Sequence, residues 1–452
     1  MSLEHAEERT AYTFAQGMHV VVVMALVTFA LGMVHLPLNV VVDPVRKAFG
    51  ISDVQASLLM GLAYSAPFTL MSLAGGWLSD RMRRRTLLSA GMVLWSAAAV
   101  LGALAHSFEG LLLSRVLVAV GAGCKMPVAM TWVNDAFPPG QRGRAIGAFF
   151  MVMGIGPALA ITLPGLVLRL AEGGAFAGWP LLSTLDPWRL TLLLLALPTL
   201  LLLPLVWGLP DLRSVYLVEE SRLDGTQPQE VAAPASIAIA PTPGLFGLLG
   251  LSAGLLLMET FDIANISWMP TIFKRVYGYD AAQAGMVFGV VTMVAGTVGP
   301  IVGGFLGDRA FKSHGVAGRL WVCAAASLAC IPLLSAYLQA RPLVLASALT
   351  ACGILTVMVI SLGFVSVQAM LPPERRGFGT GVLSAGIELL GSTGPTLTAL
   401  VAQHMLSGPA ALAHSVAAIC ALTALLTSIV FCVTARSSSR LGSSEEVTAR
   451  AA

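Results

Sequence analysis

The chain has 452 residues, of which 56% are hydrophobic and only 11% are charged. Soluble globular proteins carry about 25% charged residues, so this composition excludes a cytosolic enzyme, a nucleic-acid-binding protein and a disordered scaffold. The net charge of +3 gives no reason to expect a polyanionic partner. This much apolar surface cannot be buried in one soluble domain, so we expect the chain to cross a membrane several times.

A membrane-spanning helix needs about 20 mostly apolar residues. Twelve stretches meet this requirement, and they predict an all-α integral membrane protein with two groups of six helices. The predicted spans of the first group are 20–42, 56–78, 86–105, 110–133, 145–168 and 190–209. Those of the second group are 246–268, 281–306, 320–338, 343–370, 379–402 and 410–433.

The polar segments divide the chain into four parts. We expect an N-terminal six-helix bundle over 1–209, a solvated cytoplasmic linker over 210–243, a C-terminal six-helix bundle over 244–434 and a disordered cytoplasmic tail over 435–452. Basic residues gather in the loops on one side, notably Arg81, Arg83, Arg84 and Arg85. Because cytoplasmic loops are rich in Lys and Arg, this bias predicts that both termini are cytoplasmic.

Two loop motifs of the first half recur in the second. Gly-Gly-Trp-Leu-Ser-Asp-Arg at 75–81 follows the second span, and Gly-Gly-Phe-Leu-Gly-Asp-Arg at 303–309 follows the eighth. Phe-Pro-Pro-Gly-Gln-Arg at 137–142 has a counterpart in Leu-Pro-Pro-Glu-Arg-Arg at 371–376. The repetition predicts two homologous bundles on either side of a central path.

The first of these motifs has a physical rationale. Glycines allow two helix backbones to approach closely in a membrane. Asp80 lies at a helix end within reach of arginines, so it could form a charged contact that closes in one conformation and opens in another. An ordinary basic cytoplasmic loop is the alternative interpretation.

This motif also carries a family resemblance. Gly76, Asp80, Arg81 and Arg84 resemble the signature loop of the major facilitator superfamily, which is repeated in weaker form at Asp308 and Arg309. The twelve helices and the internal repeat extend the likeness over nearly the whole chain. The resemblance implies the fold of that family and a secondary transporter, with these residues in gating rather than in binding.

Three further stretches resemble bacterial spinster-like transporters. They are Leu-Asn at 38–39 with Asp-Pro-Val-Arg at 43–46, Gly-Ile-Ser-Asp at 50–53 with Gln55 and Ser-Leu-Leu at 57–59, and Phe-Pro-Pro at 137–139 with Arg-Gly-Arg-Ala-Ile-Gly at 142–147. Asp135 and Arg142, together with Arg144, resemble the cytoplasmic charge network of the family, which implies a gating role. The stretch 152–160 resembles the glycine–proline kink of exporters, although Ala160 stands where a glycine is usual.

The chain departs from the spinster-like pattern at the proton site. Val34 and His35 stand where the family carries an Asp-Arg pair, and Gly121-Ala122-Gly123 stands where it carries Gly-Glu-Ala. Both carboxylates that the resemblance would assign to proton coupling are therefore missing. The usual proton site cannot be carried over to this chain.

Other polar residues lie within the predicted spans. A charge at the bilayer centre costs about 2.5–3.5 kcal/mol on insertion scales, so such residues face a partner or a water-filled cavity. The resemblance implies that the first, fourth, seventh and tenth helices line the central cavity. The candidates for substrate binding and coupling are His35, Asn39, Arg115, Lys125, Glu259, Asp262 and Glu388.

Each charged candidate keeps two interpretations. Arg115 matches the family's arginine in the fourth helix and is either a substrate ligand or a structural partner. Glu259 and Asp262 are three residues apart and share a helix face, so one of them is a candidate proton carrier or both neutralise Lys125 and Arg115. Lys125 is either a functional cation or part of a structural salt bridge. Because the resemblance places the seventh helix across the cavity from the fourth, an ion pair of Lys125 with these acids is geometrically plausible in the empty site. Glu388 is either functional or part of a bundle interface.

The sequence therefore predicts a secondary active transporter in a bacterial inner membrane, which moves a small anionic or amphipathic solute, such as a lysolipid- or sphingoid-like molecule. Alternating access with proton coupling is the preferred mechanism. An uncoupled facilitator, or an exporter of organic acids or drugs, is the runner-up, and a non-transporting membrane sensor is the alternative from another class. We expect a monomer with substrate, protons and membrane lipids as partners, and no enzyme activity, nucleic acid, metal or cofactor.

Overall fold

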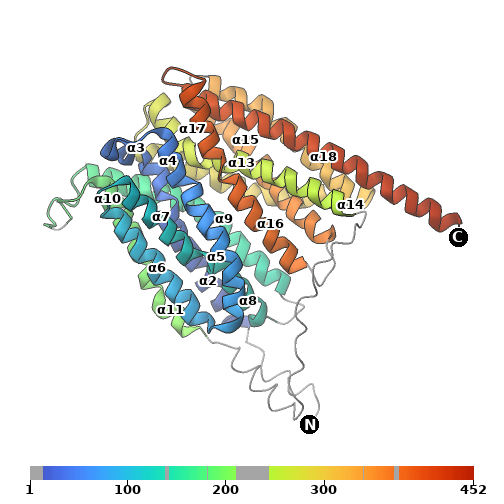
Figure 1. Cartoon of the computed structure of the whole chain (residues 1–452), viewed down its shortest axis with the longest axis horizontal. Coiled ribbons are helices and arrows are strands. Elements are labelled where there is room, and N and C mark those ends of the chain that lie inside the picture. The colour runs from blue at the N-terminus through green and yellow to red at the C-terminus, as the bar shows by residue number, and fades with distance from the viewer. Residues whose placement is uncertain are drawn as a thin grey trace, which may run out of the picture.

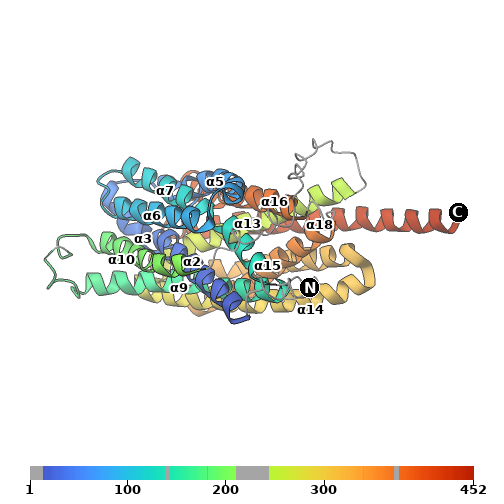
Figure 2. The same ribbon diagram turned by 90° about the horizontal axis from the view of Figure 1, so that it is seen from below.

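The computed structural model describes residues 14–137, 142–180, 182–209, 244–339, 341–370 and 376–451. The regular secondary structure of these residues is helical, and the predicted all-α membrane class is confirmed. The N-terminal half, drawn from blue to green, lies beside the C-terminal half, drawn from yellow to red (Figure 1, Figure 2).

Each half is built from membrane-length helices, some of which are broken into two. The first half contains α2 (Phe14–His35), α3 (Pro37–Phe49), α4 (Asp53–Met60), α5 (Leu62–Arg81), α6 (Arg84–Ala103), α7 (Phe108–Gly123), α8 (Lys125–Ala136), α9 (Arg142–Glu172), α10 (Pro187–Leu201) and α11 (Leu203–Gly208). The second half contains α13 (Gly244–Tyr277), α14 (Ala281–Leu333), the 3-10 turn η1 (Leu334–Leu338), α15 (Pro342–Met370), α16 (Arg376–Gly391), α17 (Gly394–His404) and α18 (Ala411–Ala451).

The breaks follow from local chemistry. A proline lacks a backbone N–H and crowds the carbonyl four residues before it, so it interrupts a helix one turn upstream. Pro37, Pro127, Pro204 and Pro395 stand in the first turns of α3, α8, α11 and α17, and each of these helices begins at such a break. The break between α4 and α5 falls instead at Gly61, whose φ and ψ of −111° and −101° lie outside the helical region.

The predicted spans agree with the helices. Nine segments of the described residues are long and apolar enough to cross a membrane. One of them, 281–338, contains two predicted spans, and α14 bends between them at Gly315, which has a φ of 57° that favours glycine. The helix α9 and the pair α16–α17 stand where two more spans are predicted.

The predicted linker and the predicted tail differ in what the structure describes of them. The predicted linker, 210–243, lies outside the described residues. The predicted disordered tail continues α18 as a helix to Ala451. This extension contains Arg, Leu, Glu and Ala residues, which are strong helix formers even where no core covers them.

The two halves approach each other along two seams where glycine lets the backbones come close. On the first seam, a Cβ atom at Gly61 would lie 2.5 Å from the carbonyl oxygen of Ser392, between α16 and α17. On the second, a Cβ atom at Gly285 of α14 would lie 2.9 Å from the carbonyl oxygen of Ile161 in α9, and the Thr162 hydroxyl donates to the Gly285 carbonyl at 3.2 Å.

The duplicated glycine motif contains one packed and one open position in each half. A Cβ atom at Gly75 would lie 2.8 Å from the Cα of Cys124, and one at Gly303 would lie 3.0 Å from the Cγ of Met358. A Cβ atom at Gly76 or Gly304 would meet nothing within 4 Å. The close approach expected for this motif is therefore made by Gly75, and Gly76 faces open space.

This difference predicts opposite effects of two neighbouring substitutions. Gly75→Ala should reduce the free energy of unfolding by about 1–3 kcal/mol, because the backbone of α7–α8 must move away. Gly76→Ala should leave it unchanged or raise it by up to about 1 kcal/mol, because alanine favours the helix. Thermal unfolding of the two variants in detergent checks this, and equal losses would contradict it.

Candidate functional site

Arg115 is buried where two broken helices end. Its guanidinium donates to the carbonyl oxygens of Val34 (3.5 Å) and His35 (3.2 Å) at the C-terminus of α2, and of Leu59 (3.2 Å) near the C-terminus of α4. Helix C-termini carry partial negative charge and carbonyls without an intrahelical partner, which a cation stabilises. The breaks at Pro37 and Gly61 therefore create the site that Arg115 fills.

His35 completes the surroundings of Arg115. An Nη2 atom of Arg115 lies 2.7 Å from His35 Nδ1, and because a guanidinium only donates, Nδ1 is the acceptor. The imidazole stacks on Tyr64 with ring centroids 3.8 Å apart, and Tyr64 stacks on Phe68 at 5.4 Å. Tyr64 is a site residue that the sequence did not predict, and an aromatic residue one turn after a helix-breaking glycine was its only signal.

These contacts favour a structural role for Arg115. Arg115→Gln should reduce the free energy of unfolding by about 2–4 kcal/mol, because three carbonyls lose their charged donor. Affinity for an acidic ligand should change less than it does when Lys125 is replaced. Chemical unfolding in detergent, with a binding titration on the same preparation, measures both quantities. Unchanged stability together with a tenfold loss of affinity would instead make Arg115 a substrate ligand.

Lys125 is the first residue of α8, directly after the break at Cys124, and only 8% of its surface is exposed. No hydrogen bond or ion pair of its ammonium group is found among the described residues. The carboxylate whose charge acts on Lys125 is that of Glu388 on α16, in the opposite half. The charge of Lys125 also interacts electrostatically with His35. It is therefore a central cation without a direct hydrogen-bonded partner in the described part of the protein.

Three half-buried carboxyl groups of the C-terminal half lie near one another. Glu259 on α13 interacts electrostatically with Asp262 and Glu388. A Cβ atom at Gly391 would lie only 2.8 Å from the Cγ of Glu259, so this glycine allows Glu259 to pack over the backbone of α16 beside Glu388. We call Lys125, Glu259, Asp262 and Glu388 the central charge cluster.

The cluster differs from the expected arrangement in one respect. The sequence makes an ion pair of Lys125 with Glu259 or Asp262 plausible. In the structure, the charge that acts on Lys125 is that of Glu388, and no ion pair of Lys125 is found among the described residues. Glu259 packs over Gly391 of α16, within its own half. Asn39 is buried in α3, and no contact joins it to the cluster in the described residues.

The gating candidates are only partly described. Arg81 is exposed and its guanidinium lies 3.7 Å from the ring centroid of Trp77, while Arg84 is buried. The side chains of Asp80, Asp135, Arg142 and Arg144 lie outside the described residues. In the second half, Asp308 accepts from Arg319 at 3.4 Å, and Arg309 is exposed.

The described residues contain no group of three His, Cys, Asp or Glu side chains suited to a metal ion. The central charge cluster instead combines one cation with three carboxyl groups inside the predicted spans. Helical halves that meet around charged groups at their centre define a membrane transporter. The chain belongs to the Major Facilitator Superfamily, because the model of that family matches residues 20–395.

The comparisons with individual proteins agree with this assignment. A probable sulfoacetate transporter of Cupriavidus necator is 26% identical over 298 residues, which is 65% of this chain and 65% of that protein, just under two thirds of its length. Protein spinster homolog 3 of Mus musculus is 26% identical over 374 residues, which is 79% of this chain and 70% of that protein.

A solved structure supports the fold. The inward-facing, unoccupied crystal structure of a bacterial homolog to the human lysosomal transporter spinster has a TM-score of 0.76 and 20% identity, and the match covers 94% of this chain and 98% of that one. The predicted resemblance to spinster-like members of the superfamily is confirmed.

Proposed function

We propose that this transporter is proton-coupled, moves a small anionic or amphipathic solute across a bacterial inner membrane, and works by alternating access with both termini in the cytoplasm. The observation that carries the proposal is the central charge cluster. It combines a cation from one half with three carboxyl groups from the other, and charges inside a membrane are costly unless they serve such a pathway.

The cluster supports a specific exchange. Glu388 and Lys125 interact electrostatically across the two halves. An anionic substrate that approaches Lys125 competes with Glu388, and a carboxylate without its cation binds a proton more readily. Substrate binding and protonation are thereby linked, although the chain lacks the family's usual acids. Glu259 and Asp262 provide neighbouring sites for the same proton or for the cationic part of a zwitterion.

The relatives support two substrate classes. The probable sulfoacetate transporter supports a small organic anion, for which Lys125 is the available cation because Arg115 is held by backbone carbonyls. The spinster homologue supports an amphipathic molecule whose polar head would lie at the cluster. The first class also fits the alternative of an uncoupled facilitator or exporter of organic acids.

Flux into proteoliposomes with an imposed pH gradient tests the proposal. We expect the gradient to drive accumulation of sulfoacetate, lysophosphatidylcholine or sphingosine above equilibrium, and a protonophore to abolish it. Flux that ignores the gradient would favour the uncoupled facilitator. Absence of flux for every probe, despite ligand-induced thermal stabilisation, would favour the membrane sensor.

A further inference from the structure

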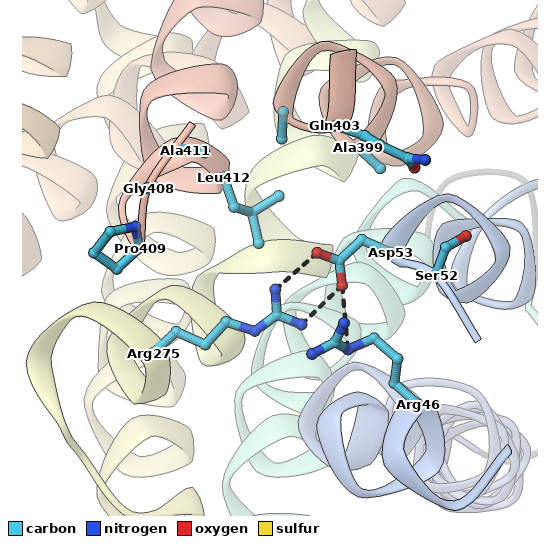
Figure 3. Close-up of a pocket in the computed structure, with 11 residues that line it drawn as sticks. Arg46, Ser52, Asp53, Arg275, Ala399, Gln403, Gly408, Pro409, Ala411 and Leu412 are labelled. Carbon is cyan, nitrogen blue, oxygen red and sulfur yellow. Dashed lines mark hydrogen bonds and ion pairs between the residues drawn. The ribbon is translucent and has the colours of Figure 1, made fainter. Parts of the chain in front are cut away.

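Arg275, near the C-terminal end of α13, binds two aspartates of the opposite half. Its Nε and Nη2 atoms donate to Asp43 Oδ1 at 3.0 and 2.6 Å, and its Nη1 and Nη2 atoms donate to Asp53 Oδ2 and Oδ1 at 2.9 and 2.8 Å. Figure 3 shows the pairing with Asp53 and the approach of Arg46 to the same carboxylate. We call Asp43, Asp53 and Arg275 the Arg275 clamp.

The clamp has the geometry of a strong contact. An arginine that pairs with a carboxylate through two parallel hydrogen bonds gains direction as well as charge attraction. Asp43 is largely buried, with 9% of its side chain exposed, and Arg275 exposes 22%. Both values are low enough to limit screening by water, unlike those of an ordinary surface pair.

The clamp lies where the halves are closed against each other. Beside it, the Ser57 hydroxyl donates to Thr396 Oγ1 at 3.2 Å, and Leu38 and Val41 of α3 belong to the same buried apolar cluster as Phe273 of α13. The elements α3, α4 and α17 gather at this end of the bundle (Figure 1).

Hydrogen bonds between α4–α5 and α16–α17 continue inward from this end. Ser65 bonds to Ser392, and Thr69 Oγ1 donates to the Ala385 carbonyl at 3.3 Å. Both bonds join the two halves on the same side as the clamp.

We propose that the Arg275 clamp is the gate at this end of the transport path, so that Asp43 and Asp53 must release Arg275 before the central site opens here. The proposal rests on the proposed alternating-access function. Under the predicted topology this end faces away from the cytoplasm, and the structure is closed there.

Arg46 is a second cation beside Asp53. Its Nε atom lies 3.4 Å from Asp53 Oδ1, and both residues belong to the N-terminal half. When Arg275 leaves with the C-terminal half, Asp53 keeps a cation on its own side. A cavity of about 290 Å³ opens beside the clamp between Gln403 and Leu412, so water can hydrate the separated charges.

The test measures opening directly, by the labelling of a cysteine that is enclosed when the gate is closed. Ser57 is fully buried beside Thr396, and Ser57→Cys is nearly isosteric. In purified protein, Arg275→Gln should increase the rate at which a polar maleimide labels this cysteine at least about fivefold, because the open state gains population. The parent without Ser57→Cys corrects for the six native cysteines.

A matched control exists at the same end. Arg169 and Asp280 also join the two halves, but at 4.0 Å and with 60% and 42% of their side chains exposed. Arg169→Gln should change the labelling rate less than about twofold, because an exposed pair contributes little. Equal effects of Arg169→Gln and Arg275→Gln, or an unchanged rate in both, would overturn the proposal.

Two further variants separate loss of the gate from loss of the fold. Asp43→Asn leaves the pairing of Arg275 with Asp53 intact. It should therefore give a labelling rate between that of the parent and that of Arg275→Gln. Reversing the pair, Asp43→Arg with Arg275→Asp, should return the rate toward that of the parent, and failure to do so in a protein that elutes normally would contradict the gate. Labelling needs no substrate, so it can establish the clamp even if no transported solute is found.

Discussion

Replacing Lys125 with alanine is expected to weaken the binding of an acidic ligand at least tenfold, which corresponds to about 1.4 kcal/mol or more. Lys125 is the central cation that lacks a direct partner in the described residues, whereas Arg115 is engaged by three carbonyls. An anion that enters the site therefore depends on Lys125. Isothermal titration of purified protein with sulfoacetate provides the measurement.

The same variant should also lose pH dependence. In the parent, a proton on Glu388 removes the negative charge that competes with an anion for Lys125, so the affinity for an anion should rise as the pH falls from about 8 to about 5. Without Lys125 there is no cation to compete for, and the profile should become flat. Lys312→Ala, which removes an exposed lysine of α14, is the control. Unchanged affinity and an unchanged pH profile in Lys125→Ala would make Lys125 a structural residue.

Replacing Glu388 with glutamine is expected to abolish accumulation driven by a pH gradient while leaving downhill exchange active. The amide cannot take up or release the proton, yet it keeps the size of the side chain beside Lys125. Because the competing charge is absent, anion binding should become tighter at pH 8 than in the parent. Paired flux assays, with a pH gradient and with equal internal and external substrate, measure the two activities.

Glu259→Gln and Asp262→Asn decide which acid carries the proton. The sequence alone favours this pair, whereas the charge of Glu388 is the one that acts on Lys125. If Glu259→Gln uncouples transport and Glu388→Gln does not, the proton is carried on α13. Equal loss of exchange and accumulation in all three variants would indicate a structural cluster. Glu172→Gln, at an exposed acid, controls for a general effect of lost charge.

The membrane class and the helices could be predicted from the sequence because their causes are local. A run of apolar residues long enough to cross the bilayer forms a helix, since no water is present there to bind its backbone groups. The prolines that break the helices act within one turn. The repeated Gly-Gly motif predicts a close helix contact for the same reason, since small neighbouring residues are a local pattern. The family resemblance carried by the loop of this motif was confirmed.

Which side chains meet could not be predicted, because it depends on the rotation and tilt of each helix. Gly75 and Gly76 are equivalent in the motif, but only the orientation of α5 places Gly75 against Cys124. Tyr64 carries no charge to mark it, and it joins the site because α5 turns it toward His35.

The sequence by itself determined a membrane protein of repeated helices with charges inside its spans, because hydropathy, proline breaks and repeats are properties of neighbouring residues. The tertiary structure alone decided how those charges combine. Arg275 meets Asp43 and Asp53 across 232 and 222 residues of chain. Such pairs form only when the packing of whole helices brings them within a few ångströms, and the sequence contains no local signal of that distance.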